Sequence, residues 1–470
     1  MMKLKKRLFA PILICGAILS SVFALQAAPG EKVKAQKIVT TEYGDISVGI
    51  LIPDRGMADP HVWIENGRLY VFCGHDKSWE PVNDWIMDSW QLWSTKDLTN
   101  WQHEYTIHPT DSYIGDQPNC WAGDLCERNG KYYWFFSNKN INTGVMVADK
   151  ITGPYTDLLG KPLLEEDLTP VHEYDPEIFV DEEGEYHICF GAGTYYMARL
   201  APDMKSLLDK PRAIMIQDKE GNRMGTGDKP TLFKRNEWYY LVCGDRYSMS
   251  KNLYGPYTFQ GSMGVGAHCS FFEWEGTWYK IHETSDTNNF YRGIGLQPVY
   301  FNEDGTMFHA ETRASHPGNG RDFTFESTEM GWHADSGTTL EYDKKKESIK
   351  GVISAKGAAI ESAVYINANT KALKSVKLEI RNETPSTKLR VGLGSVYKAK
   401  LFWKEHSPFY DWSKGSFVEV DIEPNSKKMQ QIEVPISQFK ELDEVLMQVR
   451  IEPATEASSG KWEIDNLIVR

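Results

Sequence analysis

The segment HVWIENGRLYVFCG, residues 61–74, decides the fold of this protein. It consists of an apolar run, an Asn-Gly pair at Asn66 and Gly67, and a second run rich in aromatic and β-branched residues. An Asn-Gly pair between two such runs is a strong signal for a β-hairpin, because both residues accept the positive φ angles of a tight turn. The sequence therefore predicts a hairpin whose turn lies at Gly67.

The same pattern occurs four more times in the first two thirds of the chain. The further segments are DLCERNGKYYWFFS (124–137), EIFVDEEGEYHICFG (177–191), TLFKRNEWYYLVCG (231–244) and SFFEWEGTWYKIHE (270–283). Their turns lie at Gly130, Gly184, Glu237 and Gly276, at intervals of roughly 40 to 65 residues, which is typical of propeller blades. Five units predict five blades, whereas a solenoid, the main alternative, usually has repeats of more even length.

After residue 320 the pattern changes to short alternating strands separated by polar turns. About eight such segments over ~150 residues predict a β-sandwich. We therefore expect an all-β chain, with a five-bladed β-propeller over residues 29–320 and a sandwich over residues 321–470. The sandwich either binds carbohydrate or stabilises the propeller, and the sequence leaves both interpretations open.

Residues 1–28 predict a signal peptide. The basic stretch MMKLKKRLFA is followed by the apolar stretch PILICGAILSSVFA, and small residues near Ala27 and Ala28 offer a cleavage site. The apolar run is short for a membrane-spanning helix, and Cys15 lacks the small-residue context of a lipoprotein signal. We expect an exported chain, periplasmic or extracellular, without membrane insertion after cleavage.

The composition excludes some classes of partner. A net charge of -13 argues against binding to nucleic acid or anionic membranes, which require clustered Lys and Arg. The 15 Trp and 23 Tyr residues fill β cores and also form flat platforms for sugar rings. Cys73, Cys189 and Cys243 occupy the same place in three similar strands, so we expect buried core residues rather than disulfides. No Cys/His spacing predicts a zinc site.

Two Asp-Pro pairs, Asp59–Pro60 and Asp175–Pro176, stand at the same phase of two different repeats. In a propeller, residues just before the inner strand of each blade converge on one end of the central axis. Proline fixes its own φ and favours an extended conformation in the residue before it. A single Asp-Pro is usually a turn former, but two at this phase predict carboxylates that face one cavity, as glycosidic acid–base chemistry requires.

Several motifs in order carry a resemblance to a known family. They are ADPHVW (58–63), WSTKDLTNW (93–101), WAGDLCERNGKYYWFFS (121–137), YDPEIFVDEEGEYH (174–187), DKPTLFKRNEWYYL (228–241) and GAHCSFF (266–272). Taken together, they resemble glycoside hydrolase family 43, a family of five-bladed propellers, over about residues 45–315. The resemblance implies a carbohydrate substrate, hydrolysis with inversion of configuration and no required cofactor.

The resemblance also implies roles for three acidic residues. Asp59 matches the general base that activates water, and Asp175 matches the residue that orients the acid and adjusts its pKa. Asp228 stands where the family has the Glu that acts as general acid, one methylene shorter. In an inverting enzyme the base and the acid lie ~6.5–9.5 Å apart.

The acid position departs from the family pattern. Lys229 follows Asp228 in place of a small residue, and a neighbouring ammonium would lower a carboxyl pKa, which is unfavourable for a proton donor. We expect Asp228 to be the acid, with Glu283 or His268 as alternative donors.

The resemblance places further residues at the site as substrate-binding candidates. Trp121 either stacks on a sugar or packs within its blade, and Asp124 matches the same second-blade motif at the pocket rim. His268 matches a histidine that points into the channel, in some members near calcium, and is otherwise a core histidine. Arg292 either binds sugar hydroxyls or is a solvated surface residue. We expect no catalytic metal, although a structural calcium in the channel is possible by resemblance.

The sequence thus predicts an exported, exo-acting inverting glycosidase for terminal α-L-arabinofuranose or β-D-xylose of plant polysaccharides. One alternative is a related propeller enzyme for galactose-type or algal sugars. Another is a glycan-binding propeller that has lost efficient catalysis. If Asp228 points into the pocket with Asp59 and Asp175, hydrolysis is favoured; if Lys229 fills that space, binding is favoured.

Overall fold

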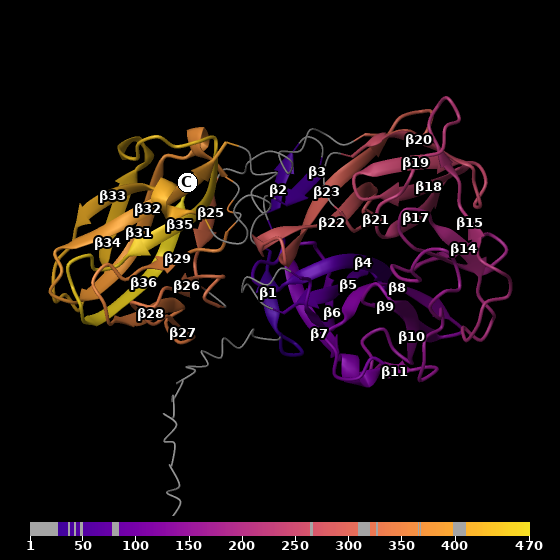
Figure 1. Cartoon of the computed structure of the whole chain (residues 1–470), viewed down its shortest axis with the longest axis horizontal. Helices are drawn as coiled ribbons and strands as arrows, with labels where there is room; N and C mark the ends of the chain where they lie inside the picture. Colours follow the sequence, from indigo (N-terminus) through magenta and orange to yellow (C-terminus); the bar gives the residue numbers. More distant parts are fainter. Residues whose placement is uncertain are drawn as a thin grey trace, which may run out of the picture.

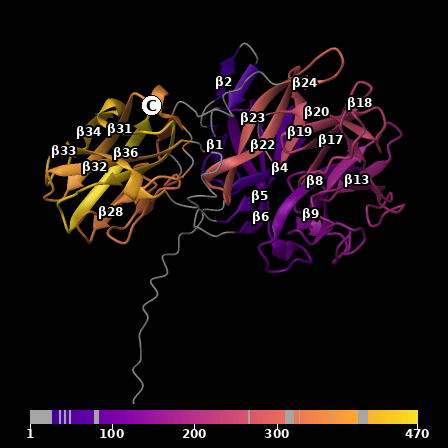
Figure 2. The same ribbon diagram turned by 45° about the horizontal axis from the view of Figure 1, so that its top comes forward.

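The computed structural model describes residues 27–35, 38–41, 44–47, 50–77, 84–263, 267–308, 320–325, 328–364, 366, 368–397 and 410–470. Almost all of the predicted signal peptide therefore lies outside the described residues. Two bodies of β-sheet stand side by side in both views, a larger one coloured indigo to salmon and a smaller orange-to-yellow one (Figures 1 and 2). No helix in the described ranges is long and apolar enough to cross a membrane.

The larger body consists of five sheets of four or five strands, arranged as the blades of a propeller. The first three, in spatial order, are β1(Lys32–Lys34)-β7(Asn100–Ile107)-β6(Met87–Thr95)-β5(Arg68–Asp76)-β4(Met57–Glu65), β11(Thr156–Asp157)-β10(Asn142–Ala148)-β9(Lys131–Asn138)-β8(Cys120–Arg128), and β12(Glu177–Val180)-β13(Tyr186–Phe190)-β14(Tyr196–Arg199)-β15(Arg212–Ala213). The last two are β16(Ile216–Gln217)-β20(Tyr257–Ser262)-β19(Arg246–Ser250)-β18(Trp238–Cys243)-β17(Pro230–Arg235) and β21(Cys269–Trp274)-β22(Thr277–Asn288)-β23(Tyr291–Phe301)-β24(Met307–Phe308). The predicted five-bladed propeller is confirmed.

The five predicted hairpins are the first two strands of the five blades. Asn66 and Gly67 have φ angles of 52° and 68°, and Asn129 and Gly130 have 55° and 76°. Two successive positive φ angles are the conformation that an Asn-Gly hairpin turn needs. The local turn chemistry therefore sets the register that places each inner strand next to the axis.

Some strands outside the hairpin pattern were not expected from the sequence. β1 adds to the outer edge of blade one, with Val33 opposite Trp101. β16 pairs with β20 in parallel and completes blade four. A separate hairpin is formed by β2(Ile38–Thr41) and β3(Gly44–Ser47). These strands are two to four residues long, so they carry little periodic signal.

Apolar side chains are packed between neighbouring blades. The cluster that closes the ring joins Val71 and Trp93 of blade one to Ile281 and Leu296 of blade five. All six cysteines in the described ranges are buried and free, which confirms the prediction made for Cys73, Cys189 and Cys243. Hydrophobic burial between blades, rather than cross-linking, therefore holds the ring closed.

The smaller body is the predicted sandwich of two sheets around one apolar core. One sheet has the order β27(Glu341–Asp343)-β28(Ser348–Ile353)-β36(Gly460–Val469)-β31(Ser375–Glu383)-β34(Gln430–Pro435), with β25(Arg321–Phe323) also on β36. The other has the order β26(His333–Ala334)-β29(Ile360–Glu361)-β35(Val445–Glu452)-β32(Lys388–Val396)-β33(Ser416–Asp421), with β30(Ala368–Asn369) also on β35. Short 3-10 turns lie at Pro109–Asp111, Thr370–Ala372, Trp412–Lys414 and Ile436–Gln438.

The two bodies are joined by buried charges. Nη1 of Arg321, on β25 of the sandwich, lies 3.2 Å from Oδ1 of Asp286 on β22 of the propeller. The backbone N–H of Asp54 donates to the other oxygen of Asp286 at 2.7 Å. The sandwich is thus attached next to blade five, where β22 and β23 extend farthest (Figure 1).

Candidate active site

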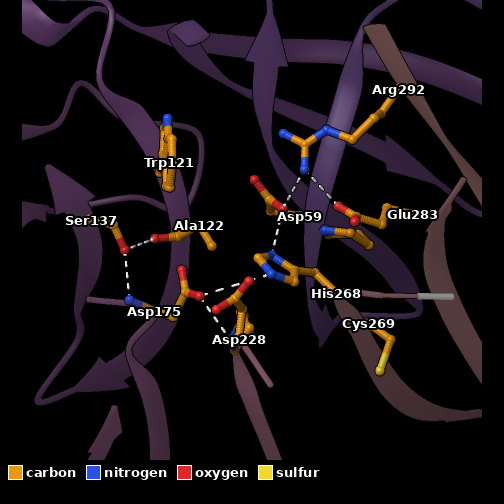
Figure 3. Close-up of polar contacts among 12 residues, drawn as sticks. Asp59, Trp121, Ala122, Ser137, Asp175, Asp228, His268, Cys269, Glu283 and Arg292 are labelled. Carbon is orange, nitrogen blue, oxygen red and sulfur yellow. Dashed lines mark hydrogen bonds and ion pairs between the residues drawn. The ribbon is translucent and has the colours of Figure 1, made fainter. Parts of the chain in front are cut away.

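The candidate site lies at one end of the propeller axis, where the inner strands of the blades begin. Asp59 lies within β4, Asp175 stands two residues before β12, and Asp228 stands two residues before β17. His268 immediately precedes β21. Figure 3 shows the side chains of these four residues facing one another around a common space, so the structure brings together residues from blades one, three, four and five.

The backbone at the two Asp-Pro pairs differs from the sequence prediction. We expected an extended conformation, but Asp59 and Asp175 have φ angles of 54° and 58°, in the left-handed region. At Asp59 a bulge shifts the register of β4 between Ala58 and His61, and the extra residue turns the backbone out of the strand. Aspartate accepts left-handed φ more readily than most residues. The turned backbone aims both carboxylates at the axis.

Asp59 is a buried carboxylate held by two cations. Its Oδ1 atom lies 2.5 Å from Nδ1 of His268 and 3.1 Å from Nη1 of Arg292. Burial alone would raise the pKa of Asp59, but Arg292 and His268 together hold that pKa well below its ordinary value. This low pKa favours the ionised form of Asp59, which is the form that a general base needs.

His268 separates the two carboxylates of the Asp-Pro pairs. Its Nε2 atom lies 3.8 Å from Oδ2 of Asp175, while Nδ1 is bound to Asp59. Burial acts to lower the pKa of His268, but Asp59, Glu283 and Asp175 raise it to about 10. His268 is thus an imidazolium placed between two acids, and the interpretation of it as an ordinary core histidine is excluded.

Asp175 is buried and only partly satisfied. Its Oδ2 atom accepts the backbone N–H of Lys229 at 2.9 Å, and its own N–H donates to Oγ of Ser137 at 2.8 Å. Its Oδ1 atom has no hydrogen-bond partner in the described part of the chain. Burial raises the pKa of Asp175 to about 6, although the positive charge of His268 acts to lower it. This carboxyl group therefore titrates close to the physiological range.

Asp228 and Lys229 point in different directions. Asp228 is exposed, accepts the Tyr174 hydroxyl at 2.8 Å on Oδ1, and lies beside Asp175 in Figure 3. The side chain of Lys229 is 0% exposed, and its ammonium binds Glu177 at 2.8 Å below the site. Lys229 therefore does not enter the space between the carboxylates, which is the arrangement that favours hydrolysis over simple binding.

Arg292 has no donor left for a substrate. Nε and Nη2 bind Asp76 at 2.9 and 3.0 Å, Nη2 also contacts Sδ of Met87 at 3.2 Å, and Nη1 binds Asp59 and Glu283. A guanidinium group has five N–H bonds, and all five have acceptors here. Arg292 is thus neither a solvated surface residue nor free to bind sugar hydroxyls; it fixes Asp59.

Trp121 and Asp124, predicted together at the rim, have different positions. Asp124 is 0% exposed; its carboxylate contacts His61 and accepts the N–H of Ile178 from the next blade. The prediction that Asp124 lies at the rim and binds substrate is therefore wrong, because its carboxylate is fully buried and bonded to protein groups. Trp121 is half-buried and stands beside the carboxylates in Figure 3.

Trp121 belongs to an aromatic cluster that the sequence did not reveal. Its ring centroid lies 6.4 Å from that of Trp85, which in turn lies 5.1 Å from that of Phe290. The Trp121 indole N–H donates to the carbonyl of Trp85 at 3.2 Å. Trp85 comes from the segment before β6 and Phe290 from the turn between β22 and β23, so no local pattern links them.

Other supporting residues were also missed. Asp76, at the end of β5, and Tyr174, next to Asp175, bind Arg292 and Asp228 respectively. The sequence offered two signals for them. One is the acidic residue that ends the apolar strand 68–76, and the other is the tyrosine directly before the second Asp-Pro pair. Neither signal is specific without the fold.

Comparison with known proteins identifies the class. Residues 52–307, more than half of the chain, match the sequence model of the glycosyl hydrolases family 43. The chain belongs to glycoside hydrolase family 43. The resemblance seen in the motifs is confirmed, and with it the assignment of an inverting enzyme that hydrolyses O-glycosyl bonds.

The similar proteins cover the propeller of this family 43 enzyme. A xylosidase/arabinosidase of Bacteroides ovatus is 27% identical over 56% of this chain and 97% of its own length. A beta-xylosidase of Xylanibacter ruminicola is 26% identical over 54% of this chain and 97% of its own. A family 43 beta-xylosidase/alpha-arabinofuranosidase from a compost metagenome, solved with xylotriose in a calcium-free form, covers 58% of this chain and 98% of its own. Its TM-score of 0.51 at 22% identity supports the fold.

The axis of this family 43 enzyme contains two groups of potential metal ligands in the described ranges, Asp59–His268–Glu283 and His61–Asp124–Glu177. In the first group, Nη1 of Arg292 binds both carboxylates. In the second group, the ammonium of Lys229 binds Glu177. Calcium requires six to eight oxygen ligands, and a protein cation already occupies each group. The residues therefore do not fit the channel calcium that the resemblance suggested.

Proposed function

We propose that this family 43 enzyme removes terminal β-D-xylose or α-L-arabinofuranose from plant-type glycans by exo action, with Asp59 as base and Asp228 as acid. One observation carries the roles: carboxylates from blades one, three and four face one space while the Lys229 ammonium turns away from it. The similarity to the xylosidase/arabinosidase and the beta-xylosidase supports the sugar class.

In this mechanism Asp59 accepts a proton from the attacking water. Arg292 and His268 keep Asp59 ionised, and their contacts to its Oδ1 atom fix the orientation of the carboxylate. Inversion requires this water to attack from the face of the sugar opposite the leaving group. Asp59 and Asp228 come from blades one and four, so a sugar bound between them has the base on one side and the acid on the other.

Asp228 then donates its proton to the leaving oxygen. The Tyr174 hydroxyl holds Oδ1, which leaves Oδ2 to carry the proton. Asp175 lies between the acid and the imidazolium of His268 and contributes negative charge next to Asp228. The exposed position of Asp228 compensates for its shorter side chain, because the leaving group can approach it from solvent.

Glu283 is the competing proton donor. Burial raises its pKa to about 7, and an acid catalyst works best near the operating pH. However, Glu283 binds the same Nη1 atom of Arg292 as Asp59, at 2.9 Å, so it stands beside the base. An inverting acid has to lie across the sugar from the base, which favours Asp228.

The aromatic cluster of Trp85, Trp121 and Phe290 supports exo action on a chain end. Trp121, which is half-buried and drawn near the carboxylates in Figure 3, offers an apolar wall for one face of a sugar ring. We propose that this wall closes one end of the subsite for the terminal sugar.

The test of these roles is a pair of variants on xylobiose and on aryl xylosides and arabinofuranosides. Asp59→Asn is expected to lower kcat by about 10²–10⁴-fold on every substrate, the usual contribution of a general base. Asp228→Asn is expected to lose similar activity on xylobiose but little on 2,4-dinitrophenyl glycosides, whose leaving group needs no proton.

The matched control is Asp149→Asn, an aspartate whose side chain is 83% exposed. Unchanged turnover in Asp59→Asn would remove Asp59 as base. Equal losses of Asp228→Asn on good and poor leaving groups, together with a leaving-group effect in Glu283→Gln, would transfer the acid role to Glu283.

We further propose export through the amino-terminal leader. The basic and apolar stretches of residues 1–28 support this. Amino-terminal sequencing of protein from the culture medium or periplasm is expected to begin near Ala28. A mature protein that retains Met1 in the cytoplasm would contradict export.

A further inference from the structure

Lys229 has an unusual position for a lysine. It precedes Pro230 with a φ angle of 29°, and its side chain is 0% exposed. The ammonium lies 2.8 Å from Oε2 of Glu177, 3.2 Å from the carbonyl of Pro176 and 3.4 Å from its neighbouring carbonyl at Pro230. An ammonium group has three N–H bonds, and here each has an oxygen acceptor.

The surroundings of this ammonium are those of a cation site. Ligand atoms of His61, Asp124 and Glu177, from the inner strands of blades one, two and three, lie within 4.8 Å of one another. Burial alone would lower the pKa of Lys229, but Glu177 and Asp124 raise it above its ordinary value. Three blades therefore supply polar or acidic groups, and the fourth supplies the positive charge.

Lys229 also connects this buried layer to the catalytic layer. Its backbone N–H donates to Oδ2 of Asp175 at 2.9 Å. Its ammonium holds the next two residues of the same segment, Pro176 through the carbonyl and Glu177 through the carboxylate. Lys229 of blade four thus binds three successive residues of blade three, one through its backbone N–H and two through its ammonium group.

We infer that the Lys229 ammonium is a built-in axial cation, which takes the place of a metal ion and fixes Asp175 in its working position. Lys229 is then a positioning residue, since it reaches the substrate only through Asp175. This inference rests on the proposed role of Asp175 for its effect on rate, whereas its effect on cation binding is independent of hydrolysis.

The first experiment uses the wild-type enzyme. After dialysis against EDTA, addition of millimolar Ca²⁺ is expected to leave kcat, KM and the thermal midpoint unchanged, and calorimetric titration is expected to give no binding heat. Stoichiometric Ca²⁺ binding, or loss of activity in EDTA that Ca²⁺ restores, would overturn the inference even if no variant could be purified.

The second experiment removes the ammonium in two ways. Lys229→Ala removes both the charge and the side-chain volume, and Lys229→Met keeps most of the volume without charge. Both are expected to lower kcat by about 10²-fold, the usual effect of small misplacement of a catalytic group. Only Lys229→Ala is expected to regain thermal stability and part of its kcat with methylammonium or Ca²⁺, because only it leaves space for them.

The pH profile separates positioning from general loss of structure. Without the nearby positive charge, the acidic limb of kcat/KM is expected to move to higher pH in Lys229→Met. Lys234→Ala removes a lysine of β17, the strand that begins directly after Lys229, and this lysine pairs with the exposed Glu182; it is the control and is expected to behave as wild type. A Lys229→Met enzyme with wild-type kcat and pH profile, or a Lys229→Ala enzyme whose stability responds to neither cation, would overturn the inference.

Discussion

Two layers of charged residues lie one above the other on the propeller axis, and they differ in exposure and balance. Asp59 and Asp175 belong to the upper layer, while His61 and Glu177, each two residues later in the sequence, belong to the lower layer. The upper layer opens to solvent next to Asp228 and leaves Oδ1 of Asp175 without a partner in the described structure. In the lower layer, Lys229 and Asp124 are buried and paired.

Residues proposed for catalysis and residues that stabilise the fold therefore lie only two positions apart in the sequence. The positive φ angles of Asp59, Asp175 and Lys229 all lie at the junction between the layers. Such conformations cost of order 1–3 kcal/mol each and persist only where the surroundings impose them. The lower layer, with its interblade ion pair and backbone hydrogen bonds, supplies that constraint.

The largest contrast is expected between Glu177→Gln and Asp228→Asn in stability. Glu177→Gln leaves the buried Lys229 ammonium without its carboxylate, so the free energy of unfolding should fall by about 3–5 kcal/mol. Asp228→Asn changes an exposed side chain and should alter it by less than about 0.5 kcal/mol. Denaturant unfolding followed by tryptophan fluorescence measures both, and equal losses would show that the layers are not distinct.

Asp175→Asn is expected to lower the activity of the enzyme and to raise its stability at neutral pH. Burial raises the pKa of Asp175 from its ordinary value of 3.8 to about 6, so the folded state binds this proton more tightly. Wild-type stability should therefore fall as pH rises from 4 to 6, by up to about 3 kcal/mol. Asp175→Asn should lack this fall and be more stable than wild type at pH 7.5, but not at pH 3.5, while its kcat collapses.

Thermal unfolding of both proteins across pH 3.5–8 tests this prediction. If the Asp175→Asn protein is less stable than wild type at pH 7.5, the ionised Asp175 carboxylate stabilises the folded state, and the prediction is wrong.

Arg292→Lys should weaken the upper layer without unfolding it. Lysine cannot bind Asp59, Asp76 and Glu283 with one planar group, so Asp59 should lose both its orientation and part of its positive environment. We expect a fall in kcat of about 10²-fold, of the size found when a catalytic group is misplaced. The pKa of Asp59 should rise, because one of its two cations is displaced. A wild-type kcat would show that Arg292 does not position Asp59.

The smallest effect is expected at the rim. Trp85→Ala removes one ring of the aromatic cluster, and such contacts contribute about 0.5–1.5 kcal/mol beyond burial, so KM should rise by up to about tenfold with kcat nearly constant. Phe308→Ala, at a similarly exposed aromatic residue on β24, is the control. A change in kcat instead of KM would place Trp85 in transition-state binding.

The sequence repeat was sufficient to predict the five blades, because the residues that form the turn of each hairpin lie within the repeat itself. It failed where a strand depends on distant partners. The stretch ESAVYINAN (361–369) reads as one strand, but its ends form the separate short strands β29 and β30, both on β35. β1 and β16 were missed for the same reason.

At the site, the spacing of Asp59 and Asp175 was informative because both precede inner strands at the same phase. The conformations of these residues were not predicted, because both have positive φ angles instead of the extended backbone usual before proline, at Asp59 in a strand bulge. The direction in which the Lys229 side chain points depends on Glu177, and the use of all Arg292 donors depends on residues such as Asp76. Both partners are more than 50 positions away in the sequence. Only the closed ring brings these partners together.

The place of β1 has a consequence for handling the protein. Residues 32–34 cover the outer edge of β7, and the N–H of Gly30 donates to the carbonyl of His103 at 2.8 Å. A protein shortened beyond Lys34 would present the bare hydrogen-bonding edge of β7, to which a second molecule can add a strand. Self-association would then begin far from the axis, in a molecule whose catalytic centre is intact.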